Sequence, residues 1–137
     1  MGPEENAAAV RDFVERAWNN GEEAVFEEHL ADDFAAFGGR EGFRQVILGY
    51  RSAFPDLHMA VEDSFGAGDR VVTRFTVTGT HQGELMGIAP TGREIEVGGI
   101  AIDVMRGDKR VDGWVEIDRM ALMTQLGVVD APGPMSD

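Results

Sequence analysis

Carboxylates close to the C-terminus are the first side chains in this sequence that could do chemistry. The stretch VDGWVEIDRMALMTQLG, residues 111–127, carries Asp112, Glu116 and Asp118 around one tryptophan, Trp114. A carboxylate that faces a pocket can act as an acid or a base, whereas one that faces water keeps the surface hydrated. The direction in which each acid points therefore decides its role.

Alternation along the strand expected at 111–118 separates these acids from the apolar residues. Successive side chains of a strand point to opposite faces. One face collects Val111, Gly113, Val115 and Ile117, and the other collects Asp112, Trp114, Glu116 and Asp118. The pattern predicts that the acids point outward. Asp118 stays a catalytic candidate because it stands at the strand end, where a bulge can re-aim a side chain.

Asp103 is a second catalytic candidate, on the strand that precedes this one. It shares a face with apolar residues and one glycine: Ile95, Val97, Gly99, Ala101 and Met105. If Glu96 points to water, Asp103 points inward, and apolar surroundings raise the pKa of a carboxylate. The alternative is a solvated aspartate near the turn at Gly107.

Asp33 and His81 are further catalytic candidates. Asp33 follows the second expected helix, where it either looks into the mouth of a cavity or is solvated at the helix end. His81 lies in the turn GTHQG, where it either acts on a ligand or caps a loop. No histidine stands at a spacing from acids that resembles a metal site, so none is predicted.

Three helices and about four strands must position these residues. Apolar residues at helical spacing predict helices within 5–21, 22–34 and 38–54. The pattern then changes to strands at 57–68 and 69–83, a Pro-Thr-Gly turn within 87–95, and two long strands within 93–118 joined at 107–109. This order predicts an α+β fold in which the helices pack on a curved antiparallel sheet and close a cone with an apolar cavity.

Aromatic, sulfur-containing and aliphatic side chains on the expected inner faces are the candidates for lining that cavity. They are Trp18, Phe34, Phe37, Tyr50, Phe54, Phe75, Met86 and Val115. The alternative for most of them is a place in the solid core. Tyr50 could also offer its hydroxyl to an oxyanion.

Composition narrows the classes of partner. The chain of 137 residues fits one domain, expected at 1–129, with a flexible tail at 130–137 rich in proline and glycine. Acids outnumber bases by 25 to 12, and a net charge of −13 argues against nucleic acid and against an anionic membrane. The sequence has no cysteine, so it can form no disulfide bond. It also has no apolar run long enough to span a membrane, and together these two features favour a cytoplasmic protein.

Most of the chain resembles the SnoaL-like polyketide cyclases of the NTF2-like superfamily. The motifs that carry the resemblance are Phe54-Pro55-Asp56, Gly79-Thr80-His81 with Gly83, Pro90-Thr91-Gly92 and Gln125-Leu126-Gly127. The resemblance implies the NTF2-like cone fold. It also implies that an aspartate on a late strand acts as general base next to a carbonyl, and that the enolate closes a ring without metal or cofactor. The chain departs from its relatives around Trp114, because Gly113 stands where many carry histidine and Val115 where they carry an acid.

Three interpretations of function follow from the sequence. The first is a cyclase or isomerase that acts on a hydrophobic, carbonyl-bearing, polyketide-like substrate. The second is a non-catalytic module of the same fold that binds a hydrophobic ligand or only dimerises, and the third is an epoxide-opening hydrolase or cyclase with two carboxylates on one water. For each we expect a homodimer formed through the outer sheet face, at Ile100, Ile102 and Trp114.

Overall fold

Helices occupy the first part of the chain and strands the second. The computed structural model describes residues 2–130. Its elements are α1 (Pro3–Phe13), the π-helical turn η1 (Val14–Asn19), α2 (Val25–His29), the 3₁₀ turn η2 (Ala36–Gly38), α3 (Gly39–Ala53), β1 (His58–Ala67), β2 (Arg70–Thr80), β3 (Glu94–Arg106), β4 (Lys109–Ile117) and α4 (Arg119–Gln125). This order confirms the predicted α+β fold with three N-terminal helices.

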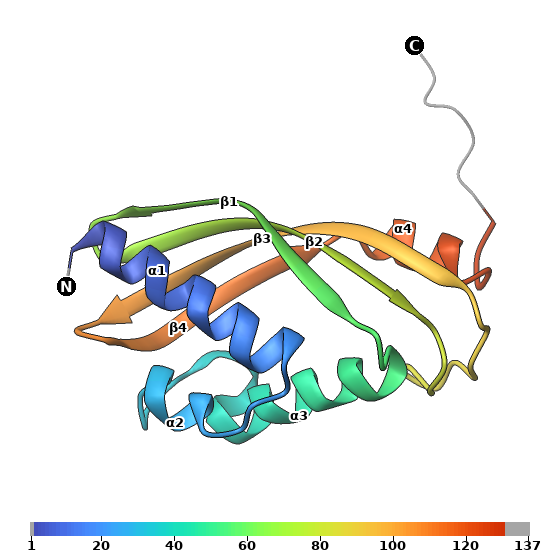
Figure 1. The fold of residues 1–137 in the computed structure, drawn as a ribbon, viewed down its shortest axis with the longest axis horizontal. Coiled ribbons are helices and arrows are strands. Elements are labelled where there is room, and N and C mark those ends of the chain that lie inside the picture. Colours follow the sequence, from blue (N-terminus) through green and yellow to red (C-terminus); the bar gives the residue numbers. More distant parts are fainter. Residues whose placement is uncertain (1, 131–137) are drawn as a thin grey trace, which may run out of the picture.

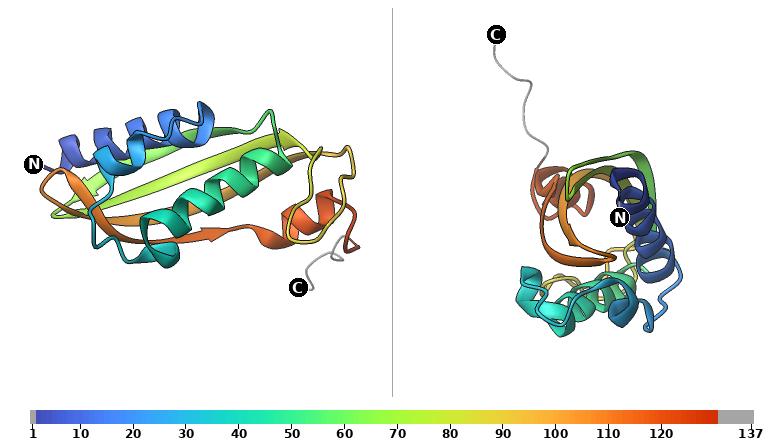
Figure 2. Two further views of the ribbon diagram at one scale, coloured as in Figure 1. Left: turned by 90° about the horizontal axis from the view of Figure 1, so that it is seen from below. Right: turned by 90° about the vertical axis from the view of Figure 1, so that its left-hand side faces the viewer.

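The four strands form one antiparallel sheet in the order β1-β2-β3-β4. The sheet is long and curved, and α1 and α3 lie across its concave side (Figure 1). Seen from the end of the molecule, the sheet curls strongly, and α1 and α3 lie on the inner side of its curve (Figure 2). The result is the cone that the sequence predicts.

The second helix is much shorter than expected. The apolar pattern predicts a helix within 22–34, but α2 ends at His29 and Leu30 adopts an extended conformation. Leu30 forms a bridge with Arg110, and the Ala31 N–H donates to the Arg110 carbonyl at 2.9 Å. Strand β4 is at the edge of the sheet, so its free backbone groups take hydrogen bonds that a continued helix would have kept internal.

Aromatic side chains hold the three helices together. Phe13 of α1 is fully buried, with its ring centroid 5.6 Å from that of Phe26 and 5.5 Å from that of Phe43. Phe34 stacks on the Phe43 ring as well, at 5.7 Å. Burial of each such side chain stabilises the fold by roughly 1.5–3 kcal/mol, so this cluster contributes to holding α1 and α3 together.

The motifs around residues 54–56 and 79–81 join the end of α3 to the end of β2. The Asp56 carboxylate accepts hydrogen bonds from the Thr80 backbone N–H at 2.7 Å and from the Thr80 hydroxyl at 2.8 Å. These bonds, led by the one from the backbone N–H, lower the pKa of Asp56 below its ordinary value. The Phe54 ring is fully buried against the His81 ring, at 5.4 Å.

Helix α4 begins at Asp118 and closes the other end of the sheet. The Asp118 Oδ1 accepts the Ala121 N–H at 2.9 Å, which makes Asp118 the N-cap residue. Leu122 and Leu126 are buried, and the Gln125 side-chain amide makes two hydrogen bonds with the backbone of Glu96. Asp118 is exposed, in agreement with the outward direction that alternation predicts.

Asp118→Ala should lower the free energy of unfolding by about 1 kcal/mol, because the Ala121 N–H loses its cap. Asp118→Asn should cost much less, because asparagine caps helices as well as aspartate does. Urea unfolding followed by circular dichroism measures both. Equal stability of the wild type and the alanine variant would contradict the capping role.

Candidate functional site

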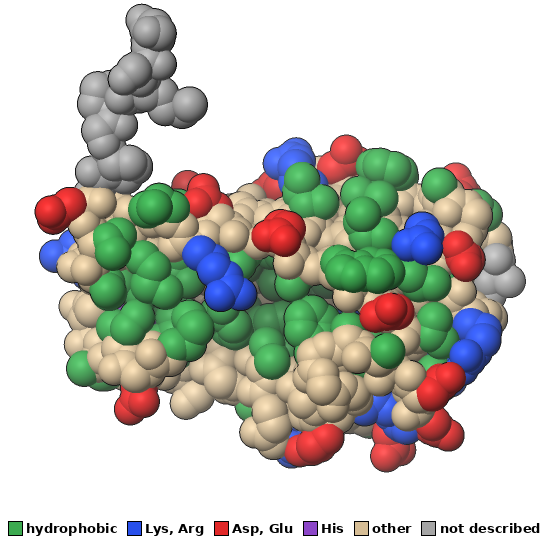
Figure 3. Space-filling view, turned by 180° about the vertical axis from the view of Figure 1, so that it is seen from behind, with side chains coloured by type: hydrophobic (Ala, Val, Ile, Leu, Met, Phe, Trp, Pro, Cys, Tyr) green, Lys and Arg blue, Asp and Glu red, His purple; other side chains and the backbone are tan. Residues whose placement is uncertain are grey.

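A cavity of about 470 Å³ lies between the concave side of the sheet and the helices α1 and α3. This volume is within the range of sites that enclose a drug-sized ligand. The exposed residues of its wall come from α3, the 81–93 loop, β4 and the start of α4, so the cavity opens between these elements. Hydrophobic side chains gather around the hollow on this side of the molecule (Figure 3).

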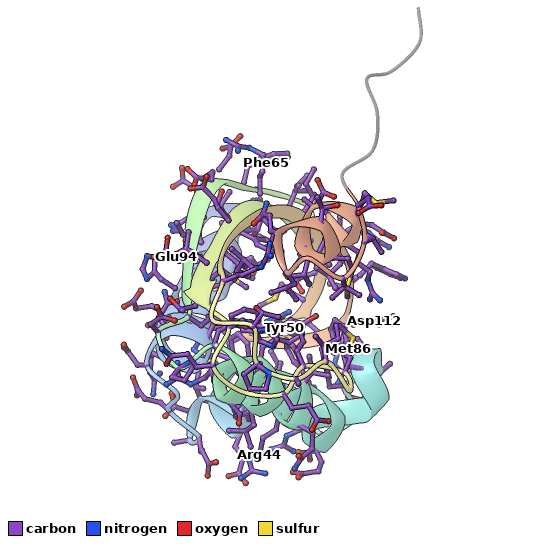
Figure 4. The ribbon with its side chains drawn as sticks, turned by 90° about the vertical axis from the view of Figure 1, so that its right-hand side faces the viewer. Arg44, Tyr50, Phe65, Met86, Glu94 and Asp112 are labelled. Atoms are coloured by element: carbon purple, nitrogen blue, oxygen red, sulfur yellow. The ribbon has the colours of Figure 1, made fainter. Side chains whose placement is uncertain are left out.

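Six of the eight predicted ligand-binding residues line this cavity: Trp18, Phe37, Tyr50, Phe75, Met86 and Val115. Tyr50 points from α3 toward the space that the sheet encloses, and Met86 lies on the 81–93 loop (Figure 4). Phe34 and Phe54 are absent from the wall, and both are buried in the core instead. Their aromatic type alone did not distinguish a core position from a cavity position.

Asp103 and Arg110 form a buried ion pair in the wall of the cavity. The Arg110 Nη2 donates to the Asp103 Oδ1, and only 2% of Asp103 and 6% of Arg110 is exposed. The Arg110 guanidinium also lies over two aromatic rings, 4.8 Å from the Phe13 centroid and 5.4 Å from the Phe43 centroid. Asp103 therefore faces inward as alternation predicts, and its neighbours include a cation as well as apolar groups.

A bulge explains why the sequence pattern did not reveal Arg110. Alternation counted from Val111 places Arg110 outward, beside Asp112. In the structure Val104 pairs with Asp112 and Met105 pairs with Arg110, so Val111 is an extra residue. The bulge reverses the alternation before Asp112 and turns Arg110 inward.

Gly113 provides the space in which the Asp103 carboxylate lies. The two residues are paired across β3 and β4, and a Cβ at position 113 would stand 2.7 Å from the Asp103 Oδ1. A larger side chain at 113 would displace the carboxylate from Arg110. Gly113 is thus coupled to the ion pair.

The other three predicted catalytic residues do not line the cavity. Asp33 is exposed and forms a bidentate ion pair with Arg106, with N···O distances of 2.7 and 3.1 Å. The hydrogen bonds from Arg106 lower the pKa of Asp33. His81 is fully buried, and its Nδ1 accepts the Thr91 backbone N–H at 3.1 Å, which braces the 81–93 loop. Asp118 caps α4 on the convex side.

Thr73 is another polar residue of the cavity that the sequence did not suggest. It lies on β2 in the cavity wall, it is 2% exposed, and its hydroxyl has no hydrogen-bond partner among residues 2–130. The Arg110 Nε is also buried without a hydrogen-bond partner among residues 2–130. At the entrance, exposed Gln45, Glu84 and Arg119 complete the polar part of the wall.

Residues 2–130 contain no group of three or more histidine, cysteine, aspartate or glutamate side chains arranged to hold a metal ion. In the same part of the chain, no helix has the length and the apolar character needed to cross a membrane.

A curved four-stranded sheet that helices close around a cavity defines the NTF2-like class of proteins. The family model of SnoaL-like polyketide cyclases matches residues 8–126, so the chain belongs to the SnoaL-like polyketide cyclase family. This confirms the resemblance drawn from the sequence motifs. No match was found among proteins of curated function.

Three solved structures of similar proteins come from Streptomyces species. AclR of Streptomyces galilaeus, a proposed hydroxylase, is 28% identical over 96% of this chain and 85% of AclR, with a TM-score of 0.82. TsrD of Streptomyces laurentii is 30% identical over 89% of this chain and 97% of its own, with a TM-score of 0.80. IdmH of Streptomyces antibioticus, a proposed polyketide cyclase, is 29% identical over 89% and 98%, with a TM-score of 0.78.

Gly113→Ala should lower the free energy of unfolding by about 1–3 kcal/mol, because the new methyl group overpacks the Asp103 carboxylate. Gly98→Ala is a matched control on β3, where a Cβ meets only the Phe75 carbonyl at an ordinary 3.7 Å. Chemical unfolding of both variants beside the wild type provides the comparison. A Gly113→Ala protein as stable as the Gly98→Ala protein would show that the carboxylate moves without cost.

Proposed function

We propose that this protein is a cofactor-independent cyclase or isomerase that acts on a hydrophobic, polyketide-like carbonyl compound bound in the cone. The observation that carries the proposal is the buried Asp103–Arg110 pair in the wall of a mostly apolar cavity. Membership of the SnoaL-like family and the similarity to IdmH support the same class of reaction.

Asp103 is the base in this proposal. Arg110 engages Oδ1 and leaves Oδ2 to take a proton from the carbon next to the substrate carbonyl. The electron pair of that C–H bond moves onto the carbonyl oxygen as an enolate. In a cyclase the enolate carbon attacks a second carbonyl carbon of the same molecule, and the new alkoxide recovers the proton from Asp103. In an isomerase the proton returns to a different carbon.

Arg110 stabilises charge on both sides of this proton transfer. Before the transfer its cation balances the Asp103 carboxylate, and afterwards the negative charge has moved to the enolate oxygen. A fixed guanidinium in a low-dielectric site interacts strongly with either anion and does not have to reorganise. Packing against Phe13 and Phe43 fixes the guanidinium in place.

The two alternative functions, a binding module and an epoxide-opening enzyme, would use the same cavity but have no need of the Asp103–Arg110 pair. A module that only binds an apolar ligand gains nothing from two buried charges, whose desolvation costs several kcal/mol per ion. An epoxide-opening enzyme needs a second carboxylate beside the first. Among the described residues, the only other acid in the cavity wall is Glu84, which is exposed at the entrance.

Solvent deuterium exchange into the α-methylene of butyronaphthone, a naphthyl ketone, tests the proposal without knowledge of the natural substrate. NMR should show catalysed exchange with the wild type and a loss of about 10²–10⁴-fold in Asp103→Asn, the usual contribution of a positioned base. Asp33→Asn is the matched control, because it breaks an exposed ion pair outside the cavity and should leave exchange unchanged.

Folding must be checked in parallel, because loss of one partner from a buried ion pair costs about 3–5 kcal/mol. The double variant Asp103→Asn/Arg110→Gln removes both charges and serves if the single variant unfolds. Exchange at the wild-type rate in either folded variant, or no exchange by a wild type that binds the ketone, would exclude Asp103 as the base.

We also propose that the protein forms a homodimer through its convex sheet face. Ile100 is 51% exposed, Ile102 38% and Trp114 53%, and Ile102 pairs directly with Trp114 across β3 and β4. Such a continuous apolar patch is unfavourable in water unless a partner covers it.

Light scattering at micromolar concentration should give about twice the 14.9 kDa mass of the chain. Ile102→Glu should give a monomer, because a charge in the patch is costly to bury. A monomeric wild type at this concentration would refute the dimer.

A further inference from the structure

Thr73 is the one polar side chain in an apolar row on the inner face of β2. The row reads Val71, Thr73, Phe75 and Val77, and all four residues are buried. Valine has the shape of threonine and would fill the same space without a hydroxyl. Buried polar groups in folded proteins almost always have partners, so a hydroxyl without a protein partner in a cavity wall is available to bind a ligand.

The pairing of the strands orders three polar groups across the cavity. Thr73 on β2 lies opposite Ala101 of β3, and Asp103 lies two residues further along β3 on the same face. On the other side, Arg110 of β4 lies opposite Met105, again two residues further. Asp103 is therefore between Thr73 and Arg110 both across the sheet and along it.

The two outer groups can act as donors while the middle group is an acceptor. The Arg110 Nε–H is buried without a partner among residues 2–130, and an arginine N–H can only donate. The Thr73 hydroxyl can donate to a second oxygen. A donor, a base and a donor in this order match the sequence carbonyl, acidic carbon, carbonyl of a β-dicarbonyl compound.

We propose that Thr73 is a specificity-determining residue that binds the second oxygen of a β-dicarbonyl group, while Arg110 binds the first. The methylene carbon between the two carbonyls then faces Asp103. Such a carbon is much more acidic than one next to a single ketone, so the same carboxylate removes its proton more readily. The inference rests on the proposed function, because it names the substrate class of the same site.

A matched pair of ligands tests the proposal by binding alone. Naphthoylacetone and butyronaphthone have the same carbon skeleton, and only the first has a second carbonyl. Binding is followed by quenching of tryptophan fluorescence, since Trp18 lines the cavity. The wild type should bind the diketone about tenfold more tightly than the monoketone, the value of one net hydrogen bond.

Three variants assign this preference to the Thr73 hydroxyl. Thr73→Val should reduce the preference to about one, while Thr73→Ser keeps the hydroxyl and most of the preference. Thr76→Val is the control, because Thr76 lies on the same strand but outside the cavity wall, and it should bind both ligands as the wild type does. The melting temperature of ligand-free Thr73→Val should equal or exceed that of the wild type, because no internal hydrogen bond is lost.

Three results would overturn the proposal. These are a wild type without preference for the diketone, a Thr73→Val protein with the wild-type preference, and a clear fall in its melting temperature, which would give the hydroxyl a structural role. These binding results can be distinguished from the result of the deuterium-exchange experiment, which tests the proposed function. A diketone preference that depends on Thr73 in a protein without exchange activity would leave the subsite intact and reject the catalytic role of Asp103.

Discussion

The ion pair between Asp103 and Arg110 is buried in the cavity wall, in the part of the cone where α1 packs on the sheet. Removing two charges from water costs a large part of the folding free energy of a chain of this size. A buried charge whose partner has been removed would cost even more. The surroundings offset that penalty in several ways. The strands place the two residues on the same inner face, and the rings of Phe13 and Phe43 lie against the guanidinium. Helix α1, which supplies Phe13, thus contributes to the core and to the site at once.

Two backbone features make this pair geometrically possible. The bulge at Val111 turns Arg110 to the inner face, and Gly113 leaves room for the carboxylate opposite it. A regular β4 would point the guanidinium to water, and a side chain at 113 would occupy the place of the carboxylate. Gly113 therefore belongs with the arrangement of charge in the cavity, which is built from aspartate and arginine.

The apolar wall and the polar pair have complementary effects on a ligand. Trp18, Phe37 and Tyr50 face the cavity from the helix side, and β-branched and aromatic residues face it from the sheet, so most of the wall is apolar. In such surroundings the few polar groups interact strongly with an oxygen of the ligand, and unpaired ones favour ligands that complete them. In the proposed function, binding comes mainly from the apolar wall, and orientation of the ligand from Thr73, Asp103 and Arg110.

The chain order of helices and strands, the inner face of β3 and the outward direction of Asp118 follow from the sequence alone, because helical spacing and strand alternation are local patterns. Those patterns place Asp103 on the inner face and Ile100 and Ile102 on the outer face, and the structure confirms both. They do not reveal which core-type aromatics border empty space, so Phe34 and Phe54 were expected at the cavity and lie in the core. They also do not reveal Arg110 or Thr73 as site residues. The bulge that turns Arg110 inward arises from the pairing of β4 with β3, and the missing partner of Thr73 becomes visible only when the helices have closed the cone.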